Sequence, residues 1–211
     1  MNLPNSTKLN KKLKSYFERN IKNGRTLLSE VKTINLIHKL SSKTINIATT
    51  PKVKEILIFE IILNKKELPK ELLRSIIIPD IPVLYLLRYE DSCAYAISLL
   101  EGKNHLFLEF VDTKNVALFD FFDFSGTNLE KIYHNIAKEF LKNIKDTNID
   151  ISKVEFKELL ELNNKIETLK KEIQTYQNKI SKEKQFKKQL ELKRGLKPLQ
   201  KELETILKEK E

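Results

Sequence analysis

The last third of the chain carries a long apolar seam. In residues 153–180 large apolar side chains recur at alternating steps of three and four residues, and Lys, Glu, Gln and Asn fill most positions between them. This period is that of a helix with one apolar stripe, and its persistence over three heptads indicates a coiled coil. The seam consists of Leu159, Leu162, Ile166, Leu169, Ile173, Tyr176 and Ile180.

A second seam follows the first and is out of phase with it. It consists of Leu192, Leu196, Leu199, Leu203 and Ile206. The change of phase implies a turn or a local unwinding between Ser181 and Gly195. We favour an antiparallel hairpin that turns near residues 182–187, because the two seams would then cover each other. A turn at residues 195–198 is the alternative, since Gly often follows a helix and Pro often begins one. An uncovered seam of this length would need a protein partner, so both seams are candidate partner-binding residues.

The first 151 residues predict a globular domain with basic N-terminal helices. Helices are expected at residues 8–17, from about 26 to 40, at 68–75 and at 127–141, where Thr127 or Asn128 is the candidate N-cap. Strands are expected at 54–63, 83–89, 92–99, 105–111 and 116–124, and the unbroken apolar run at 54–63 is typical of a strand covered on both faces. The fold class expected is α+β: a mainly antiparallel sheet of four or five strands packed by helices, followed in residues 152–211 by a C-terminal antiparallel helical hairpin or coiled coil.

Charge is distributed unevenly along the chain. The net charge of +10 combines a basic N-terminal quarter, an acidic middle and a basic C-terminal arm. The frequent Lys, Asn and Ile suggest an AT-rich genome, which raises the lysine content without any ligand. No apolar run is long enough to span a membrane or to act as a secretion signal, so a cytoplasmic location is expected. A single cysteine, Cys93, excludes an internal disulfide and suggests a small buried strand residue.

One short pattern suggests nuclease chemistry. Pro79-Asp80 followed by Glu101-Gly102-Lys103 satisfies the PD-(D/E)xK pattern, in which Asp80 and Glu101 would hold a metal ion and Lys103 would lie beside the attacking water. A surface turn explains the same residues and is the interpretation we favour. The three His residues lack metal-ligand spacing, no Gly-rich phosphate loop is present, and no cofactor is expected.

The basic N-terminal segment is the candidate nucleic-acid-binding site. Its cations lie beside Tyr16 and Phe17 and could follow a phosphate backbone, although a solvated helix face explains them as well. They are Lys8, Lys11, Lys12, Lys14, Arg19, Lys22 and Arg25. The same two interpretations apply to the lysines at the expected tip of the helical hairpin, which are Lys182, Lys184, Lys187 and Lys188.

Several stretches together resemble an uncharacterised bacterial family, one of the numbered families of unknown function. The matching segments, which span nearly the whole chain, are Leu40-Ser41-Ser42-Lys43-Thr44-Ile45-Asn46-Ile47, Val53-Lys54-Glu55-Ile56, Ile58-Phe59-Glu60-Ile61, Ile81-Pro82-Val83-Leu84-Tyr85, Tyr95-Ala96-Ile97, Leu129-Glu130-Lys131-Ile132-Tyr133 and Lys182-Glu183-Lys184-Gln185-Phe186. Members of this family look like companions of type III-like restriction–modification and helicase genes, which implies a role in defence against phage DNA. The chain departs from the family at Gly195 and Pro198, where the resemblance implies a continuous helix.

These observations lead to one main hypothesis and two alternatives. The main hypothesis is a non-enzymatic accessory subunit of a bacterial restriction or anti-phage defence complex. It would bind a larger helicase, nuclease or methyltransferase and could also contact DNA. The first alternative is a metal-dependent DNA nuclease built on Asp80, Glu101 and Lys103. The second is a coiled-coil homodimer that binds DNA through residues 8–25.

Overall fold

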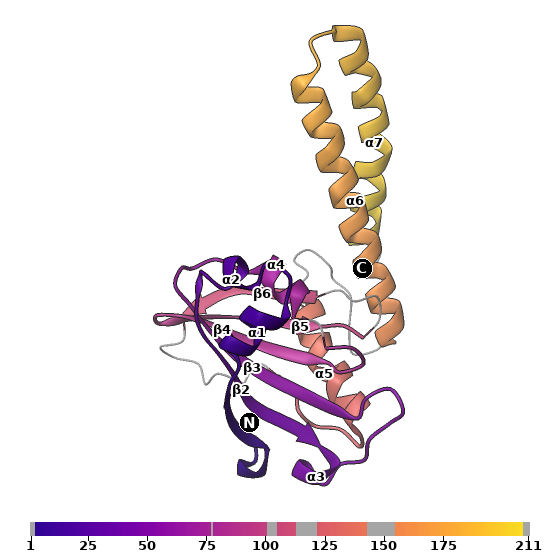
Figure 1. Ribbon diagram of the computed structural model, residues 1–211. Coiled ribbons are helices and arrows are strands. Elements are labelled where there is room, and N and C mark those ends of the chain that lie inside the picture. Colours follow the sequence, from indigo (N-terminus) through magenta and orange to yellow (C-terminus); the bar gives the residue numbers. More distant parts are fainter. Residues whose placement is uncertain (1–2, 77, 101–104, 113–121, 143–154, 209–211) are drawn as a thin grey trace. The chain divides into compact units, whose positions relative to one another are not determined.

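The computed structural model describes residues 3–76, 78–100, 105–112, 122–142 and 155–208, and it divides the chain into two compact units, Met1–Phe140 and Leu141–Glu211 (Figure 1). The strands are β1 (Lys8–Lys12), β2 (Val31–Ser41), β3 (Glu55–Leu63), β4 (Val83–Tyr89), β5 (Ser92–Ser98) and β6 (His105–Asp112). The helices are the single 3₁₀ turn η1 (Asn5–Thr7), α1 (Lys14–Asn20), α2 (Gly24–Leu27), α3 (Ser42–Ile45), α4 (Lys70–Ser75), α5 (Leu129–Lys142), α6 (Phe156–Lys182) and α7 (Phe186–Lys208).

The sheet of the first unit is mixed, and its described strands lie side by side in chain order from β1 to β6. All neighbouring strands are antiparallel except β3 and β4, which are parallel. A parallel pair needs a crossover connection, and α4 lies in that connection. The α+β class is thus confirmed, but the prediction of four or five mainly antiparallel strands is wrong in strand number and omits the parallel pair.

The two additional strands replace helices that the sequence predicts. Residues 8–12 form β1 rather than the start of a helix, and residues 31–41 form β2, so that only the short α1 and α2 remain helical. The apolar positions Leu28, Val31 and Ile34 fit a helical period, but residues 31–37 are rich in β-branched side chains, which favour an extended backbone. Strand β1 shows no alternation because all five of its residues are exposed.

One face of the sheet is covered by α1, α2 and α4. Phe59, Ile61 and Leu63 of β3 point to this face and form a buried core with Phe17 of α1 and Leu73 of α4. The Phe17 and Phe59 rings lie 6.2 Å apart, and the Phe59 and Tyr85 rings stack at 5.9 Å. The Tyr85 hydroxyl donates to the Ile76 carbonyl at 2.9 Å, which satisfies the polar end of a fully buried side chain.

Helix α5 covers the opposite face. The Phe122 ring lies 5.0 Å from that of Tyr95 on β5 and 5.4 Å from that of Phe140 on α5. The helix begins with Asn128, whose Oδ1 accepts a hydrogen bond from the Lys131 amide at 2.8 Å, so Asn128 is the N-cap. The predicted buried face of this helix is confirmed, and it consists of Leu129, Ile132, Tyr133, Ile136, Ala137, Phe140 and Leu141. Since both faces are covered, the unbroken apolar run of β3 is explained.

The second unit contains an antiparallel hairpin of the long helices α6 and α7 (Figure 1). The chain turns at residues 183–185, so the earlier of the two predicted turns is confirmed and the turn at 195–198 is wrong. Gly195 and Pro198 both lie inside α7, which continues from Phe186 to Lys208. The predicted strand at 116–124 lies mostly outside the described residues, and residues 122–124 are not a strand.

Candidate interaction surfaces

The nuclease hypothesis gains no support from the described residues. Asp80 lies in an exposed turn with a left-handed backbone (φ 61°), between β3 and β4. Glu101 and Lys103 lie outside the described residues, so the structure does not test whether the three side chains come together. Within the described ranges, no group of three or more His, Cys, Asp and Glu side chains is placed to hold a metal ion.

Two histidines occupy structural positions in the first unit. His38 Nδ1 lies 2.8 Å from the hydroxyl of the fully buried Thr7, and burial together with the charge of Lys8 lowers the pKa of His38. The ring nitrogens of His105 are buried and have no hydrogen-bond partner among the described residues. Burial, assisted by Arg74, lowers the pKa of His105 to about 4, so its ring is neutral at physiological pH.

Cys93 is a structural residue of β5. Its side chain is 1% exposed, and its Sγ donates to the Tyr95 hydroxyl at 3.4 Å. Burial raises the pKa of the thiol, which disfavours the reactive thiolate. The prediction of a small buried strand residue is confirmed.

The predicted basic N-terminal helix is divided among several elements. Lys8, Lys11 and Lys12 belong to the exposed edge strand β1, where lysines keep an unpaired edge from joining another sheet. Lys14 donates to the Val31 carbonyl and lies near Glu18. Because these cations do not follow one helix face, the spacing that suggested a phosphate-binding helix is lost.

The remaining cations of the N-terminal segment are also divided among different elements. Arg19 donates from Nε to the Ser15 carbonyl at 3.0 Å within α1. Lys22 lies in the connection to α2, and Arg25 lies on that helix. Their role in nucleic-acid binding stays a prediction, and the structure supplies a structural explanation for Lys14 and Arg19.

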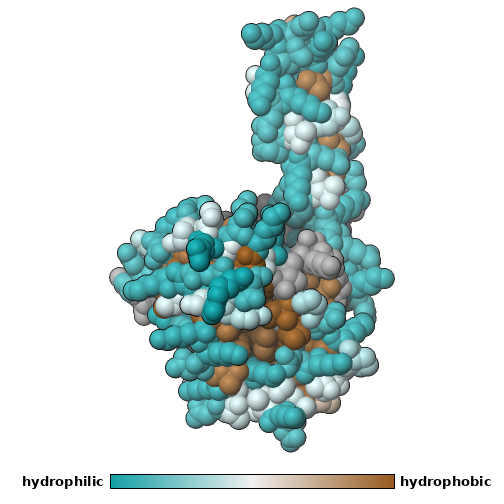
Figure 2. Space-filling model, in the orientation of Figure 1, coloured by the Kyte–Doolittle hydropathy of each residue, from teal (hydrophilic) through white to brown (hydrophobic). Residues whose placement is uncertain are grey.

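The two predicted seams lie between α6 and α7. Ile166 and Leu169 are buried, most other seam residues are half-buried, and the polar positions between them are exposed. Lys165 of α6 and Glu202 of α7 form an ion pair at 2.9 Å across the hairpin. The seam residues therefore cover one another in part, as the preferred hairpin interpretation expects. Some apolar surface of the hairpin is visible between hydrophilic side chains (Figure 2).

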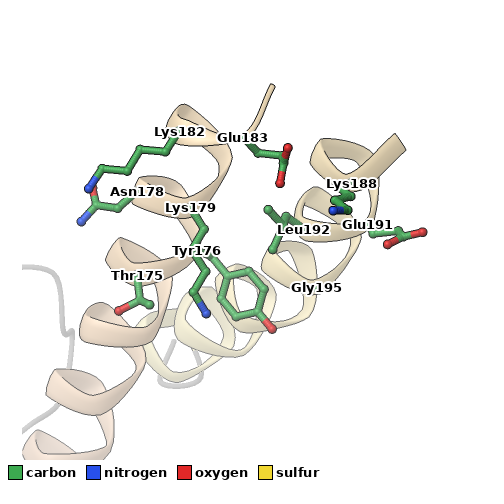
Figure 3. Close-up of a pocket in the computed structure, with 10 residues that line it drawn as sticks. All are labelled: Thr175, Tyr176, Asn178, Lys179, Lys182, Glu183, Lys188, Glu191, Leu192 and Gly195. Carbon is green, nitrogen blue, oxygen red and sulfur yellow. The ribbon is translucent and has the colours of Figure 1, made fainter. Parts of the chain in front are cut away.

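Tyr176 of α6 faces Gly195 of α7 across the hairpin (Figure 3). A Cβ atom at position 195 would lie 2.9 Å from Tyr176 Cε1, which is closer than real Cβ contacts allow. Gly195 is therefore tolerated inside a helix because the Tyr176 ring occupies the space that a side chain would fill. The Lys179 ammonium lies 5.9 Å from the centre of the same ring.

An open groove lies beside this contact, near the loop that joins α6 and α7 (Figure 3). It has a volume of about 750 Å³. Its apolar part is formed by Tyr176, Leu192 and Gly195. The polar side chains around them are Thr175, Asn178, Lys179, Lys182, Glu183, Lys188 and Glu191. The groove can accept an apolar ridge edged by charged groups. Sequence reasoning located the seam but not the groove, although a glycine inside a helical seam is a signal of close approach.

The fold and these surfaces define the class of protein: an α+β sheet unit joined to a helical hairpin that carries an open groove. The chain belongs to the family described as Domain of unknown function (DUF4391), whose sequence model matches residues 1–203. No curated protein and no solved structure matches the chain. Among the described residues, no helix combines the length and apolar character that crossing a membrane requires.

Proposed function

We propose that this protein is a non-enzymatic accessory subunit of a bacterial restriction or anti-phage defence complex in the cytoplasm. It binds a larger DNA-processing protein, a helicase, nuclease or methyltransferase, through its helical hairpin. The resemblance to companions of restriction–modification and helicase genes supports this choice of partner. The groove between α6 and α7 supports the choice of binding surface.

The observation that supports the proposal most strongly is that α6 and α7 do not fully bury the apolar residues between them. Two helices bury only one stripe of each other, whereas bundles of three or four helices enclose their apolar positions. Most seam residues are half-buried, and two of them, Tyr176 and Leu192, line the groove. A further helix laid along the groove would cover both, in the way that amphipathic helices dock into apolar grooves.

The charges of the groove specify the chemistry of the partner segment. Lys179, Lys182 and Lys188 outnumber Glu183 and Glu191 around its apolar part. Glu183 is moreover engaged, since its Oε1 accepts the Gln185 amide hydrogen at 2.9 Å. The partner segment is therefore an amphipathic helix with an apolar ridge and carboxylates beside it.

Affinity purification of the tagged full-length protein from its native host tests this proposal. The groove variant carries Lys182→Glu and Lys188→Glu, which reverse two exposed charges without touching the seam. The matched control carries Lys170→Glu and Lys171→Glu on α6, two exposed charges that do not line the groove. Both variants change the net charge equally, so a difference between them reports the groove itself.

The wild type and the control should retain a helicase, nuclease or methyltransferase, identified by mass spectrometry, and the groove variant should lose it. Recovery of only a second copy of the chain would replace the proposal with a homodimer, which light scattering would detect. Equal recovery by all three proteins would show that the groove is not the docking surface.

A further inference from the structure

The outward face of α7 carries a basic strip that the docking proposal does not use, and of its cations only Lys187 belongs to the hairpin-tip lysines considered from the sequence. Phe186 is 78% exposed and Leu190 is 42% exposed, and both lie at the end of α7 next to the loop. Exposed cations continue this face along the helix. They are Lys187, Lys193, Arg194, Lys197 and Lys201. We call these two apolar residues and five cations the outer strip.

The outer strip lies on the side of α7 that faces away from the groove. At 3.6 residues per turn, Phe186, Leu190, Arg194 and Lys197 fall on one side of the helix, and Leu192, Gly195 and Leu199 fall on the other. Only the second set faces α6, as the contact of Gly195 with Tyr176 shows. The strip is therefore a surface separate from the groove.

The cations of the outer strip are not explained by pairing within the chain. None of them forms an ion pair with a carboxylate among the residues that the structure describes. Their exposed neighbours between 186 and 201 include one acidic residue, Glu191. The other exposed acidic residues of α7, Glu202 and Glu204, follow the strip. In α6 the exposed acidic residues are spaced along the helix between the lysines, and they are Glu158, Glu161, Glu167 and Glu172. The run of a single sign is therefore confined to residues 187–201 of α7, where Glu191 is the exception.

The placement of these charges also opposes the stability of α7. Lys187 and Lys188 lie in its first turn, which holds no acidic residue, although negative side chains are favoured at a helix N-terminus. The exposed Phe186 adds a second unfavourable feature. The loop before it is held in place, because the Gln189 side chain donates to the Glu183 carbonyl at 2.6 Å. Phe186 is thus presented to solvent at a defined position.

We infer that the outer strip binds nucleic acid that contains unpaired bases. The cations contact successive phosphates, and Phe186 stacks on an unpaired base at the end of the strip, as in other single-strand binding surfaces. From Phe186 to Lys201 the strip is about 22 Å long at 1.5 Å per residue. That length can follow several phosphates of one strand. The inference does not rest on the docking function, since it uses a different face of the hairpin and needs no partner protein.

Fluorescence anisotropy with the purified full-length protein tests the inference. The probes are a labelled single-stranded DNA oligonucleotide of mixed sequence and its duplex, each measured at about 50 mM and about 200 mM salt. The strip variant carries Arg194→Gln and Lys197→Gln. The control carries Lys170→Gln and Lys171→Gln, which remove the same charge from α6. A third variant is Phe186→Ala, and circular dichroism verifies that all variants are folded.

The strip variant should bind single-stranded DNA at least tenfold more weakly than the control at low salt. Its slope of log affinity against log salt should fall by about 1.4, at about 0.7 per lost phosphate contact. Phe186→Ala should weaken single-strand binding by about tenfold and leave duplex binding nearly unchanged, because only unpaired bases stack.

Three results would overturn the inference. The strip variant and the control could bind equally, which would mean that net charge alone attracts DNA. Phe186→Ala could leave single-strand binding unchanged. Polyglutamate could compete as well as single-stranded DNA at equal charge, which would identify an acidic polypeptide as the ligand. A failure of the docking proposal would alter none of these measurements, since they use the isolated protein.

Discussion

Tyr176 of α6 lies directly against Gly195 of α7, so that a Cβ atom at position 195 would be 2.9 Å from the ring. This contact fixes the register of the two helices near their loop. It also explains why α7 contains Gly195, since a glycine lowers helix stability by about 0.5–1 kcal/mol relative to Ala.

The first prediction concerns Gly195→Ala. We expect this change to lower the free energy of unfolding of the hairpin, because overpacking costs about 1–3 kcal/mol and exceeds the gain in helix propensity. In a Tyr176→Leu background the same change should instead stabilise, since the ring is absent. Urea unfolding followed by far-ultraviolet circular dichroism measures both effects. Equal stabilisation in the two backgrounds would show that the contact between Tyr176 and position 195 does not affect the free energy of unfolding.

The ion pair between Lys165 and Glu202 gives the second prediction. Both side chains are about half exposed, so the pair should contribute about 0.2–1 kcal/mol. Lys165→Glu should lower the melting temperature slightly because it places two carboxylates together. Adding Glu202→Lys should restore it, and high salt should reduce both differences. A double variant as unstable as the single one would mean that the two groups do not interact.

Strand β1 gives the third prediction. The charges of its lysines disfavour pairing of this edge strand with another chain. Replacing them together by Lys8→Thr, Lys11→Thr and Lys12→Thr should therefore promote self-association. Sedimentation velocity should show larger species that depend on protein concentration. A monodisperse variant that had lost DNA affinity would instead favour the nucleic-acid-binding role predicted from the sequence.

His105 gives the fourth prediction, on pH dependence. Its pKa is lowered from 6.5 to about 4 in the folded chain, so the unfolded state binds more protons between these values. Stability should therefore rise with pH through this window and be lost as the pH falls from about 6.5 towards 4. His38, whose pKa is also lowered, acts in the same direction.

The His105→Phe variant isolates this contribution. It removes buried nitrogens that have no partner among the described residues, and it keeps a ring beside Tyr85 and Phe107. We expect equal or greater stability at neutral pH and a shallower loss of stability in acid. Chemical unfolding of both proteins at several pH values provides the comparison. Identical pH slopes would contradict the assigned cause.

The parts of the fold that follow from sequence are those with a strong local pattern. The unbroken apolar run of β3, the apolar face of α5 and the change of phase between the two seams each predict their element correctly. Strands β1 and β2 do not follow from the local sequence pattern, and the reason is physical. The first is an exposed edge strand without alternation, and the second has apolar positions that also fit a helix, so only pairing with β3 decides its conformation.

The candidate sites also divide into features that follow from a local sequence pattern and features that depend on how separate elements pack. The hairpin and its seams are predictable because helical periodicity is local. The groove at Tyr176 and Gly195 depends on the register between two helices, and a single sequence does not contain that register. The phosphate-binding helix expected at the N-terminus rests on charge spacing alone. Lys8, Lys11 and Lys12 lie on strand β1, so their spacing does not place them on one face of a helix.

Site-specific photocrosslinking in the native host tests the central claim most directly. A benzophenone amino acid replaces Thr175, an exposed residue that lines the groove, or Lys171, an exposed residue of α6 outside it. We predict a crosslink from position 175, and not from 171, to a larger protein identified by mass spectrometry as a helicase, nuclease or methyltransferase. Crosslinks from both positions alike, or from position 175 only to a second copy of the chain, would contradict the accessory-subunit account.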